Sequence, residues 1–478
     1  MLDQLYGLWQ SILSIPHLTT YLVIGWIAYV VGLGGWIVLQ KREPAATISW
    51  LISLAALPLL GFLIYYVFGP QRVYRQRLRR SRSRAALHPL PRGLAPDPET
   101  VELALLAQAT SGLPPTTASS VRFLVDGAAK YDALLEAVAQ ASTTIHLEYY
   151  IFEPDVTGKR LLDALAERAA AGVKVRLLLD AVGSSGLTRP LLRPLVEAGG
   201  EVTWFHPMRF SGIFKRPWLN LRSHRKIVVI DDRIAFTGGM NVSDEQDERL
   251  CKEAYRDLHL RLEGEIVREL QLVFIEDWAY STNEPPLPIP SQSAGDGPIR
   301  AQVIVSGPDS KWEAIHRMKV GAIHAARRRV WLVTPYFVPG EAARMALTSA
   351  AFGGLDVRLL VPKMSDSRLV TFAARSYFDE LLGAGVKIFE YGPRLLHTKA
   401  LLCDDDLAFV GSANFDHRSF RLNFEVSVLM MDAGVAGELA DLLEGECSAC
   451  QQVTHDRDRP LWRVRLPEAV ARLLSPLL

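Results

Sequence analysis

Residues 224–241 read HRKIVVIDDRIAFTGGMN, and residues 397–414, 173 positions later, read HTKALLCDDDLAFVGSAN. The two stretches agree at eight of eighteen positions without a gap. A single His-x-Lys pair is common on protein surfaces, but two copies that share the same Asp and Asn spacing are very hard to obtain by chance. A repeat at this distance indicates a duplicated domain, not a solenoid. We therefore expect two related halves and one functional site that uses both copies.

The segments before the two copies share one order of helices and strands. In each, a helix leads into an apolar strand, a second helix and a further β run follow, and the repeated stretch comes last. The first strands read TIHLEYYIFEPD and RVWLVTPYFVPGE, and the later β runs read VKVRLLLD and LDVRLLVP. Strands that alternate with helices predict an α/β fold, here two α/β/α sandwich halves with mixed sheets.

Composition places the boundaries between these parts. The stretch rich in Pro, Ala, Ser and Thr before the first half predicts a linker with one short helix, and STNEPPLPIPSQSAGDGPIR predicts a second linker. The expected order is an N-terminal segment, a membrane hairpin, a basic juxtamembrane segment with its linker, the first half, the second linker and the second half: 1–17, 18–71, 72–120, 121–280, 281–300 and 301–478.

Two apolar stretches without charged residues lie near the amino terminus, at residues 18–40 and 45–71. Since about 20 apolar residues cross the hydrocarbon layer as a helix, we expect a transmembrane hairpin with spans at about residues 18–40 and 45–68. A signal peptide fits poorly, because the start carries Asp3 and no Lys or Arg.

The charges around the hairpin predict its orientation. Residues 72–84 contain seven arginines, whereas the loop between the spans has two basic residues. Positive charge favours the cytoplasmic side, so the remainder of the chain is expected in the cytoplasm, with the arginines near anionic headgroups of the bilayer. Residues 1–84 carry a net charge of +7, and the remainder is therefore about −6. An acidic soluble part disfavours long nucleic acid as a partner.

Each copy of the repeat places a histidine and a lysine on one face of a strand, because alternate side chains share a face. His224 and Lys226 are one such pair, and His397 and Lys399 are the other. Each half therefore offers an imidazole for nucleophilic or acid–base work and a cation for an anionic group.

Aspartates mark the expected hairpin turns after these strands, at Asp231 and Asp404. The returning strands then bring Asn241 and Asn414 back toward the histidines and lysines. Two such sets facing each other would hold the non-bridging oxygens of a phosphodiester. One imidazole would attack phosphorus while the other protonates the leaving oxygen.

The doubled His-x-Lys-x4-Asp motif resembles the signature of the phospholipase D superfamily. With the apolar hairpin and the words YYIF, TPYFVPG, RSHRKIVVID and LLHTKALL, the chain is similar to the bacterial cardiolipin synthase family over nearly its whole length. The resemblance implies transfer of a phosphatidyl group between two phosphatidylglycerol molecules through a phosphatidyl-histidine, giving cardiolipin and glycerol. It implies a bacterial inner-membrane enzyme with a cytoplasmic catalytic part and no cofactor, because lysines neutralise the phosphate charge.

The resemblance also implies residue roles. His224 corresponds to the nucleophile and His397 to the acid and base. Asp231 and Asp404 complete the catalytic motifs but correspond to mainly structural groups near a turn. The groups that would hold phosphate are Lys226, Lys399, Asn241 and Asn414.

A carboxylate is expected beside each histidine, where it would fix the tautomer. Glu425 follows His397 by 28 residues, and Asp257 follows His224 by 33. They are the second-half and first-half candidates. One departure concerns the family's Gly-Ser-x-Asn pattern, in which Ser412 stands in the second copy but Gly has replaced Ser in the first.

Several alternatives remain open at this point. A hydrolase, or a transphosphatidylase with another alcohol acceptor, would use the same residues. The acidic soluble part disfavours a nuclease, and two intact motifs disfavour a non-catalytic lipid-binding scaffold. The four cysteines lack a second ligand pair at zinc spacing, so no metal site is expected. Residues 208–222 mix aromatic and basic side chains, which fits either a membrane-contacting segment or a packed loop.

Overall fold

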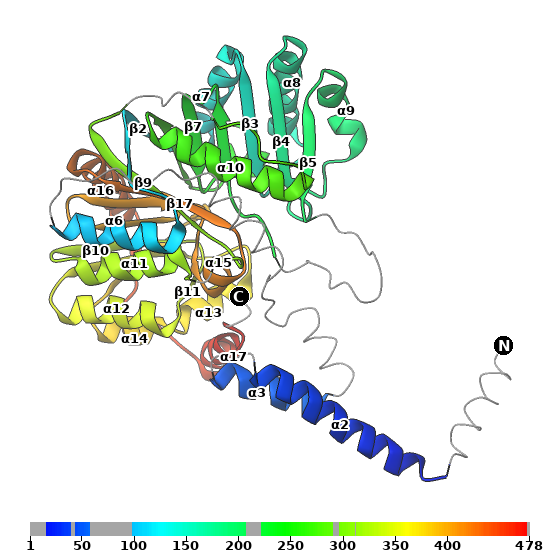
Figure 1. The fold of residues 1–478 in the computed structure, drawn as a ribbon. Helices are drawn as coiled ribbons and strands as arrows, with labels where there is room; N and C mark the ends of the chain where they lie inside the picture. Colours follow the sequence, from blue (N-terminus) through cyan, green and yellow to red (C-terminus); the bar gives the residue numbers. More distant parts are fainter. Residues whose placement is uncertain are drawn as a thin grey trace. The chain divides into compact units, whose positions relative to one another are not determined.

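The protein is described here by a computed structural model, which covers residues 16–39, 44–57, 98–206, 221–289, 296–310 and 312–475 (Figure 1). The chain divides into two units. The first comprises Met1–Gln71 with Arg209–Asn220, and the second comprises Arg72–Met208 with Leu221–Leu478.

The described part of the first unit consists of helices α2 (Leu18–Val38) and α3 (Pro44–Ala56). Ile37 and Leu54 are buried where the two helices pack together. Among the described residues, no helix combines the length and the apolarity that a bilayer crossing requires. Residues 58–68 of the second expected span lie outside the described residues, as do residues 72–84 and most of residues 208–222. The transmembrane hairpin therefore stays a prediction.

The first half of the second unit contains a mixed sheet of seven strands in the order β2-β8-β7-β6-β3-β4-β5. Strands β3, β4 and β5 are parallel, and the other pairs are antiparallel. The strands are β2 (Ser120–Val125), β3 (Thr144–Tyr149), β4 (Lys174–Asp180), β5 (Glu201–Phe205), β6 (Ile227–Ile230), β7 (Ile234–Gly238) and β8 (Leu258–Glu263). The helices are α7 (Asp126–Gln140), α8 (Val156–Ala170), α9 (Arg189–Glu197), η1 (Asp244–Gln246) and α10 (Ile266–Thr282).

The second half repeats this plan in a sheet of nine strands, ordered β1-β9-β17-β15-β14-β10-β12-β13-β18. Its strands are β1 (Thr116–Ala118), β9 (Ile299–Ser306), β10 (Arg329–Val333), β12 (Asp356–Pro362), β13 (Lys387–Tyr391), β14 (Ala400–Cys403), β15 (Leu407–Gly411), β17 (Glu425–Met431) and β18 (Gln451–Gln452). A separate pair joins β11 (Phe337–Val338) to β16 (Phe415–Asp416). The helices are α6 (Pro98–Ser111), α11 (Ala314–Ala325), α12 (Glu341–Phe352), α13 (Arg368–Arg375), α14 (Phe378–Gly383), α15 (His417–Arg421), α16 (Ala433–Ser448), η2 (Leu461–Arg465) and α17 (Leu466–Leu473).

Apolar cores cover both faces of each sheet. Helices α7, α8 and α9 bury Leu134, Leu165 and Leu195 against one face of the first sheet, and α10 lies on its other face (Figure 1). A central core joins the two halves and contains residues of both sheets together with α10 and α16. The two sandwich halves thus form one continuous body, and the predicted duplicated α/β fold is confirmed for them.

The end of the expected linker at residues 72–120 belongs structurally to the second half. Helix α6 buries Leu103 and Ala107 in the core of that half, and β1 pairs antiparallel with β9. The Gln302 side chain donates to the backbone oxygen of Leu113 over 2.9 Å. The short helix expected in this linker is present as α6, but α6 and β1 pack on the second half instead of forming a free tether.

Candidate active site

The two histidines lie shortly before the equivalent strands β6 and β14, on backbone segments that form hydrogen-bonded bridges with the other half. Ser223 forms a parallel bridge with Phe424, and Arg256 forms one with Leu396. The His224 N–H donates to the Phe424 oxygen over 2.9 Å, and the His397 N–H donates to the Arg256 oxygen over 2.7 Å. Each histidine is thus held beside the residues that lead into a strand of the opposite half, β17 for His224 and β8 for His397.

This crossing pairs each histidine with a carboxylate of the other half. His224 Nδ1 lies 3.0 Å from the Glu425 carboxylate, and His397 Nδ1 lies 2.6 Å from Asp257 Oδ2. The expected carboxylates are therefore present, but the pairing within one half that their spacing implied is not observed. In each sheet the returning strand, β7 or β15, lies between the histidine strand and the carboxylate strand, which separates partners within a half.

Burial and the Glu425 carboxylate together determine the protonation state of His224. Desolvation lowers the pKa of His224 to about 4, although Glu425 opposes this shift. Burial alone would raise the pKa of Glu425, but the interactions with His224 and Lys226 lower it to about 2. With Glu425 ionised, Nδ1 of a neutral imidazole donates to it, and the lone pair of Nε2 is free to attack an electrophile.

His397 has the same arrangement with different neighbours. Burial and the Lys399 ammonium lower the pKa of His397, and Asp257 opposes them. A bound phosphodiester anion would raise this pKa, because a nearby negative charge stabilises the imidazolium. His397 is therefore suited to carry a proton when substrate is present.

Both motif lysines are almost fully buried, with exposed fractions of 0% for Lys226 and 2% for Lys399. Lys226 Nζ donates to the His224 backbone oxygen over 2.8 Å, and Lys399 Nζ donates to the corresponding oxygen of His397. Burial lowers the pKa of Lys226 to about 7, with a contribution from repulsion by Lys399, and lowers the pKa of Lys399 to about 8. The lysines of the two halves thus influence one another, and an anion between them would restore their charge.

Asn241 and Asn414 follow strands β7 and β15, which return antiparallel beside the histidine strands, and each is 5% exposed. Their side-chain oxygens have no hydrogen-bond partner within the described part of the chain. Buried polar atoms are normally paired, so each amide oxygen has room for a ligand donor, and turning the amide over would present its NH2 group to an anion instead.

A buried lysine donates to the backbone at or next to each asparagine, which the sequence reasoning missed. Lys130 on α7 donates to the Asn241 backbone oxygen over 3.0 Å, and Lys319 on α11 donates to the Ala413 oxygen over 3.0 Å. Both lysines lie on the buried face of the helix that precedes the first apolar strand of the repeat, α7 before β3 and α11 before β10. A lysine inside an apolar helical stripe was the available sequence signal.

The motif aspartates lie at the opposite ends of β6 and β14 from the histidines. Asp231 has a φ of 53° and Asp404 a φ of 54°, so both occupy the left-handed turn conformation. Asp231 accepts hydrogen bonds from the backbone and hydroxyls that precede β3, and Asp404 accepts from the backbone N–H groups that precede β10. Both side chains therefore stabilise the hairpin turns instead of facing the histidines.

Two tyrosines also border the histidines and were not singled out from the sequence. The Tyr150 ring lies edge-on to His224 at a centroid distance of 4.9 Å, and the Tyr255 ring lies 5.5 Å from His397. Lys226 Nζ lies 5.3 Å from the centroid of Tyr150. Both rings therefore pack beside the imidazoles, one in each half of the site.

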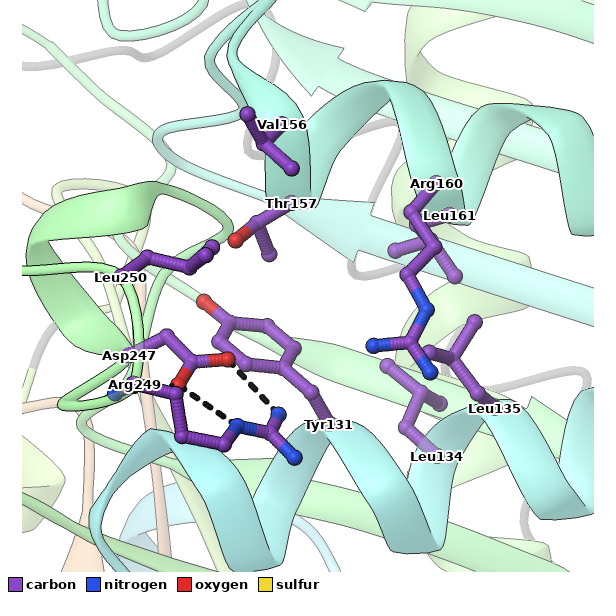
Figure 2. Close-up of a pocket in the computed structure, with 10 residues that line it drawn as sticks. All are labelled: Tyr131, Leu134, Leu135, Val156, Thr157, Arg160, Leu161, Asp247, Arg249 and Leu250. Carbon is purple, nitrogen blue, oxygen red and sulfur yellow. Dashed lines mark hydrogen bonds and ion pairs between the residues drawn. The ribbon is translucent and has the colours of Figure 1, made fainter.

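A separate cavity of about 270 Å³ lies between α7, α8 and the segment after η1 (Figure 2). Figure 2 shows Tyr131 projecting into it, with Leu134 and Leu161 among its apolar walls. The Tyr131 hydroxyl donates to the Asn241 backbone oxygen over 2.9 Å. The cavity therefore adjoins the back of the Asn241 turn and not the imidazoles.

The folded halves with their crossed histidines define the class, a phospholipase D-like enzyme. A family description, "Cardiolipin synthase, PLD-like domain", matches residues 134–278 and 320–446, and "Phospholipase_D-nuclease N-terminal" matches residues 27–70. A crystal structure of phosphatidylserine synthase from Haemophilus influenzae superposes with a TM-score of 0.60 over 79% of this chain and 100% of that chain, at 13% identity, which supports the fold alone.

Relatives specify the family further. A cardiolipin synthase of Geobacillus sp. is 41% identical over 95% of this chain and 91% of its own length. The major cardiolipin synthase of Bacillus subtilis is 36% identical over 92% of this chain and 95% of its own length. The chain belongs to the bacterial cardiolipin synthase family of the phospholipase D superfamily, and it is a phosphatidyltransferase of that family. The resemblance predicted from the repeated motifs is thereby confirmed.

Proposed function

We propose that the protein transfers a phosphatidyl group from one phosphatidylglycerol to another through a phosphatidyl-histidine at His224. The observation that supports this proposal is the pair of crossed histidine–carboxylate contacts, in which each half supplies the carboxylate for the other half's imidazole. Two imidazoles suit a two-step displacement, because one can bind phosphorus while the other moves protons.

In the first step, Nε2 of His224 attacks the phosphorus of a bound phosphatidylglycerol. The bond from phosphorus to the glycerol oxygen breaks, and His397 donates its proton to that oxygen, so glycerol leaves. Lys226 and Lys399 stabilise the charge on the non-bridging oxygens, and the buried amides of Asn241 and Asn414 donate to the same oxygens.

In the second step, a terminal hydroxyl of another phosphatidylglycerol attacks the phosphatidyl-histidine. His397, now neutral, takes the hydroxyl proton, and the bond between phosphorus and Nε2 breaks. Cardiolipin forms and His224 returns to its neutral state. Water in place of the second lipid would give phosphatidic acid. A synthase therefore differs from a hydrolase in whether a lipid hydroxyl or water reaches the phosphatidyl-histidine.

The proposed substrates place the enzyme at a membrane. We propose that residues 18–40 and 45–68 form a two-span hairpin in the bacterial inner membrane, with the catalytic unit in the cytoplasm. The apolar runs, the arginines at residues 72–84 and the match of residues 27–70 to an N-terminal family description support this arrangement. The proposed partners are phosphatidylglycerol, cardiolipin and the bilayer.

The test uses full-length protein in mixed micelles with two donors labelled in their acyl chains: phosphatidylglycerol, and a phosphatidyl donor with a good leaving group that needs no proton. His397→Ala lacks the acid and base, so we expect it to retain label covalently with the second donor. His224→Ala should retain none, and both variants should lose cardiolipin formation. His455→Ala, at an exposed histidine, is the matched control. Label on the His224→Ala variant would overturn the assignment of the nucleophile, and phosphatidic acid as the main wild-type product would favour the hydrolase.

A further inference from the structure

The carboxyl-terminal helical segment of the second unit exposes large apolar side chains along one side. It begins as a π-helical turn, η2, and continues as α17. Trp462 is 76% exposed, Leu473 is 80% exposed, and the side chains between them on the same stripe are Leu466 and Val470. These positions are separated by three or four residues, which places them on one helix face.

The opposite stripe of the same helix is small or polar, and it is the one that packs against the protein. Glu468, Ala471 and Ser475 are nearly fully buried. Glu468 forms an ion pair with Arg459, and the Ser475 hydroxyl accepts from the Tyr377 hydroxyl over 3.0 Å. The helix is therefore anchored through its polar stripe and turns its apolar stripe outward, the reverse of a helix on a water-exposed surface.

Positive charge flanks the exposed stripe. Arg463 and Arg465 are exposed, and their side chains form no ion pair with any described residue. Arg472, on the last turn, is partly neutralised by Glu380 at 3.4 Å. An exposed apolar stripe with a tryptophan and unpaired arginines is the composition of helices that lie in the headgroup layer of an anionic membrane.

We propose that this segment, Trp462 to Leu473, docks the catalytic unit onto an anionic lipid surface, lying parallel to it with Trp462, Leu466, Val470 and Leu473 inserted at the headgroup level. A second copy is a poorer occupant, because a symmetric contact through this stripe would bring Arg463 and Arg465 of both copies together. The docking itself rests on exposure and charge, and only its consequence for lipid turnover rests on the proposed function.

The direct test places a fluorophore on the stripe of the full-length protein. Val470→Cys is labelled with an environment-sensitive dye in a chain that also carries Cys251→Ser and Cys450→Ser, since Cys403 and Cys447 are buried. The protein is reconstituted into lipid discs that contain phosphatidylglycerol and a lipid with a quencher near the top of its acyl chain. We expect strong quenching at position 470 and none for Glu438→Cys, an exposed polar site on α16.

Protection of position 470 from the quencher would mean that another part of the chain or a second copy covers the stripe, and it would overturn the proposal. Equal quenching in discs made only of zwitterionic lipid would contradict the role of the arginines and thus the preference for an anionic surface.

The second test separates docking from catalysis. In the triple variant Trp462→Ser, Leu466→Gln and Leu473→Gln, we expect the KM for phosphatidylglycerol, expressed as its surface concentration, to rise about tenfold. The kcat for a soluble short-chain donor should not change, because the stripe lies outside the histidine site. Phe352→Ser, a 74% exposed apolar residue on α12, is the matched control. An unchanged KM, or an equal loss with the soluble donor, would overturn the proposal, whereas failure of the proposed function would instead appear as a different product from both substrates.

Discussion

Each half places a carboxylate beside the opposite histidine, but the residue that packs against the carboxylate differs between the halves. In the first half, a Cβ added at Gly239 would lie 2.1 Å from Asp257 Oδ1, so the short aspartate occupies the space of a side chain. In the second half, Ser412 fills that position, and its hydroxyl donates to the longer Glu425. Both carboxylates then reach the opposite histidine. The missing serine of the first motif is therefore a steric requirement of Asp257 and not a lost phosphate contact.

The halves also differ in what supports the carboxylate backbone. The fully buried Arg225 forms an ion pair with Asp277, and its Nε donates to the Glu425 backbone oxygen over 3.2 Å. Residue 398, at the equivalent place in the second half, is a threonine. Arg225 thus supports the backbone of Glu425, the partner of His224, whereas Asp126 bonds to the backbone of Asp257, the partner of His397.

The largest expected effect comes from breaking the crossed contacts. Glu425→Gln and Asp257→Asn keep the side-chain shapes but remove the charge that stabilises the imidazolium and fixes the tautomer. We expect kcat to fall about a thousandfold in each. Rapid-quench experiments should show slow formation of the phosphatidyl-enzyme in Glu425→Gln, because that residue faces His224.

The control for these variants is Glu269→Gln, a carboxyl that is 2% exposed and contacts no histidine. It should keep the wild-type rate. If Glu425→Gln instead formed the phosphatidyl-enzyme at the normal rate and failed only to release it, the assignment of Glu425 to the nucleophile would be wrong.

Sequence reasoning found the residues of the site but not how they pair. Spacing placed Glu425 near His397 and Asp257 near His224, because distance along the chain was the only guide. The order β17-β15-β14 places a strand between such partners, and this order becomes visible only when the sheet is known. The buried Lys130 was missed for a related reason, since its partner is a backbone oxygen 111 residues away. The α/β class and the hairpin turns were predictable because they depend on local alternation and turn residues.

The second prediction exchanges the residues that pack against the two carboxylates, Gly239 in the first half and Ser412 in the second. Gly239→Ser adds a side chain where Asp257 Oδ1 lies, so the carboxylate must move away from His397. We expect kcat to fall about a hundredfold with little change in KM, because a displaced orienting group weakens the transition state more than ground-state binding. Steady-state kinetics measure this. Ser412→Gly, which removes a hydrogen bond without a clash, should cost about tenfold. A larger loss in Ser412→Gly than in Gly239→Ser would contradict the steric account.

The third prediction concerns the pH dependence of substrate affinity. In the free enzyme, burial lowers the pKa of Lys226 to about 7 and that of Lys399 to about 8. Both lysines therefore lose their protons as pH rises through these values. Since the phosphodiester binds the ammonium forms, KM should rise about tenfold between about pH 7 and pH 8, and about a hundredfold for each unit above pH 8, where both lysines are neutral. Lys399→Met should shift the remaining profile to higher pH, because it removes the repulsion that lowers the pKa of Lys226. A KM that stays constant from pH 7 to pH 9 would show that the lysines keep their charge without substrate.

The smallest expected effect on turnover comes from the motif aspartates, which the two halves use alike. Burial disfavours the charged form of Asp231, but hydrogen bonds from residues 142–144 lower its pKa to about 2. A lowered pKa means that Asp231 stabilises the fold above its unfolded pKa, near 3.8, and that this stabilisation is lost as pH falls toward 2. Asp231→Ala should lower the free energy of unfolding by about 2 kcal/mol through lost hydrogen bonds and an alanine forced into the left-handed region.

Activity per folded molecule should stay unchanged, as measured by kcat after urea titration has determined the folded fraction. Asp231→Asn, which tolerates that backbone conformation, should lose less stability, and a loss of kcat in a fully folded Asp231→Asn would place this residue in the chemistry after all.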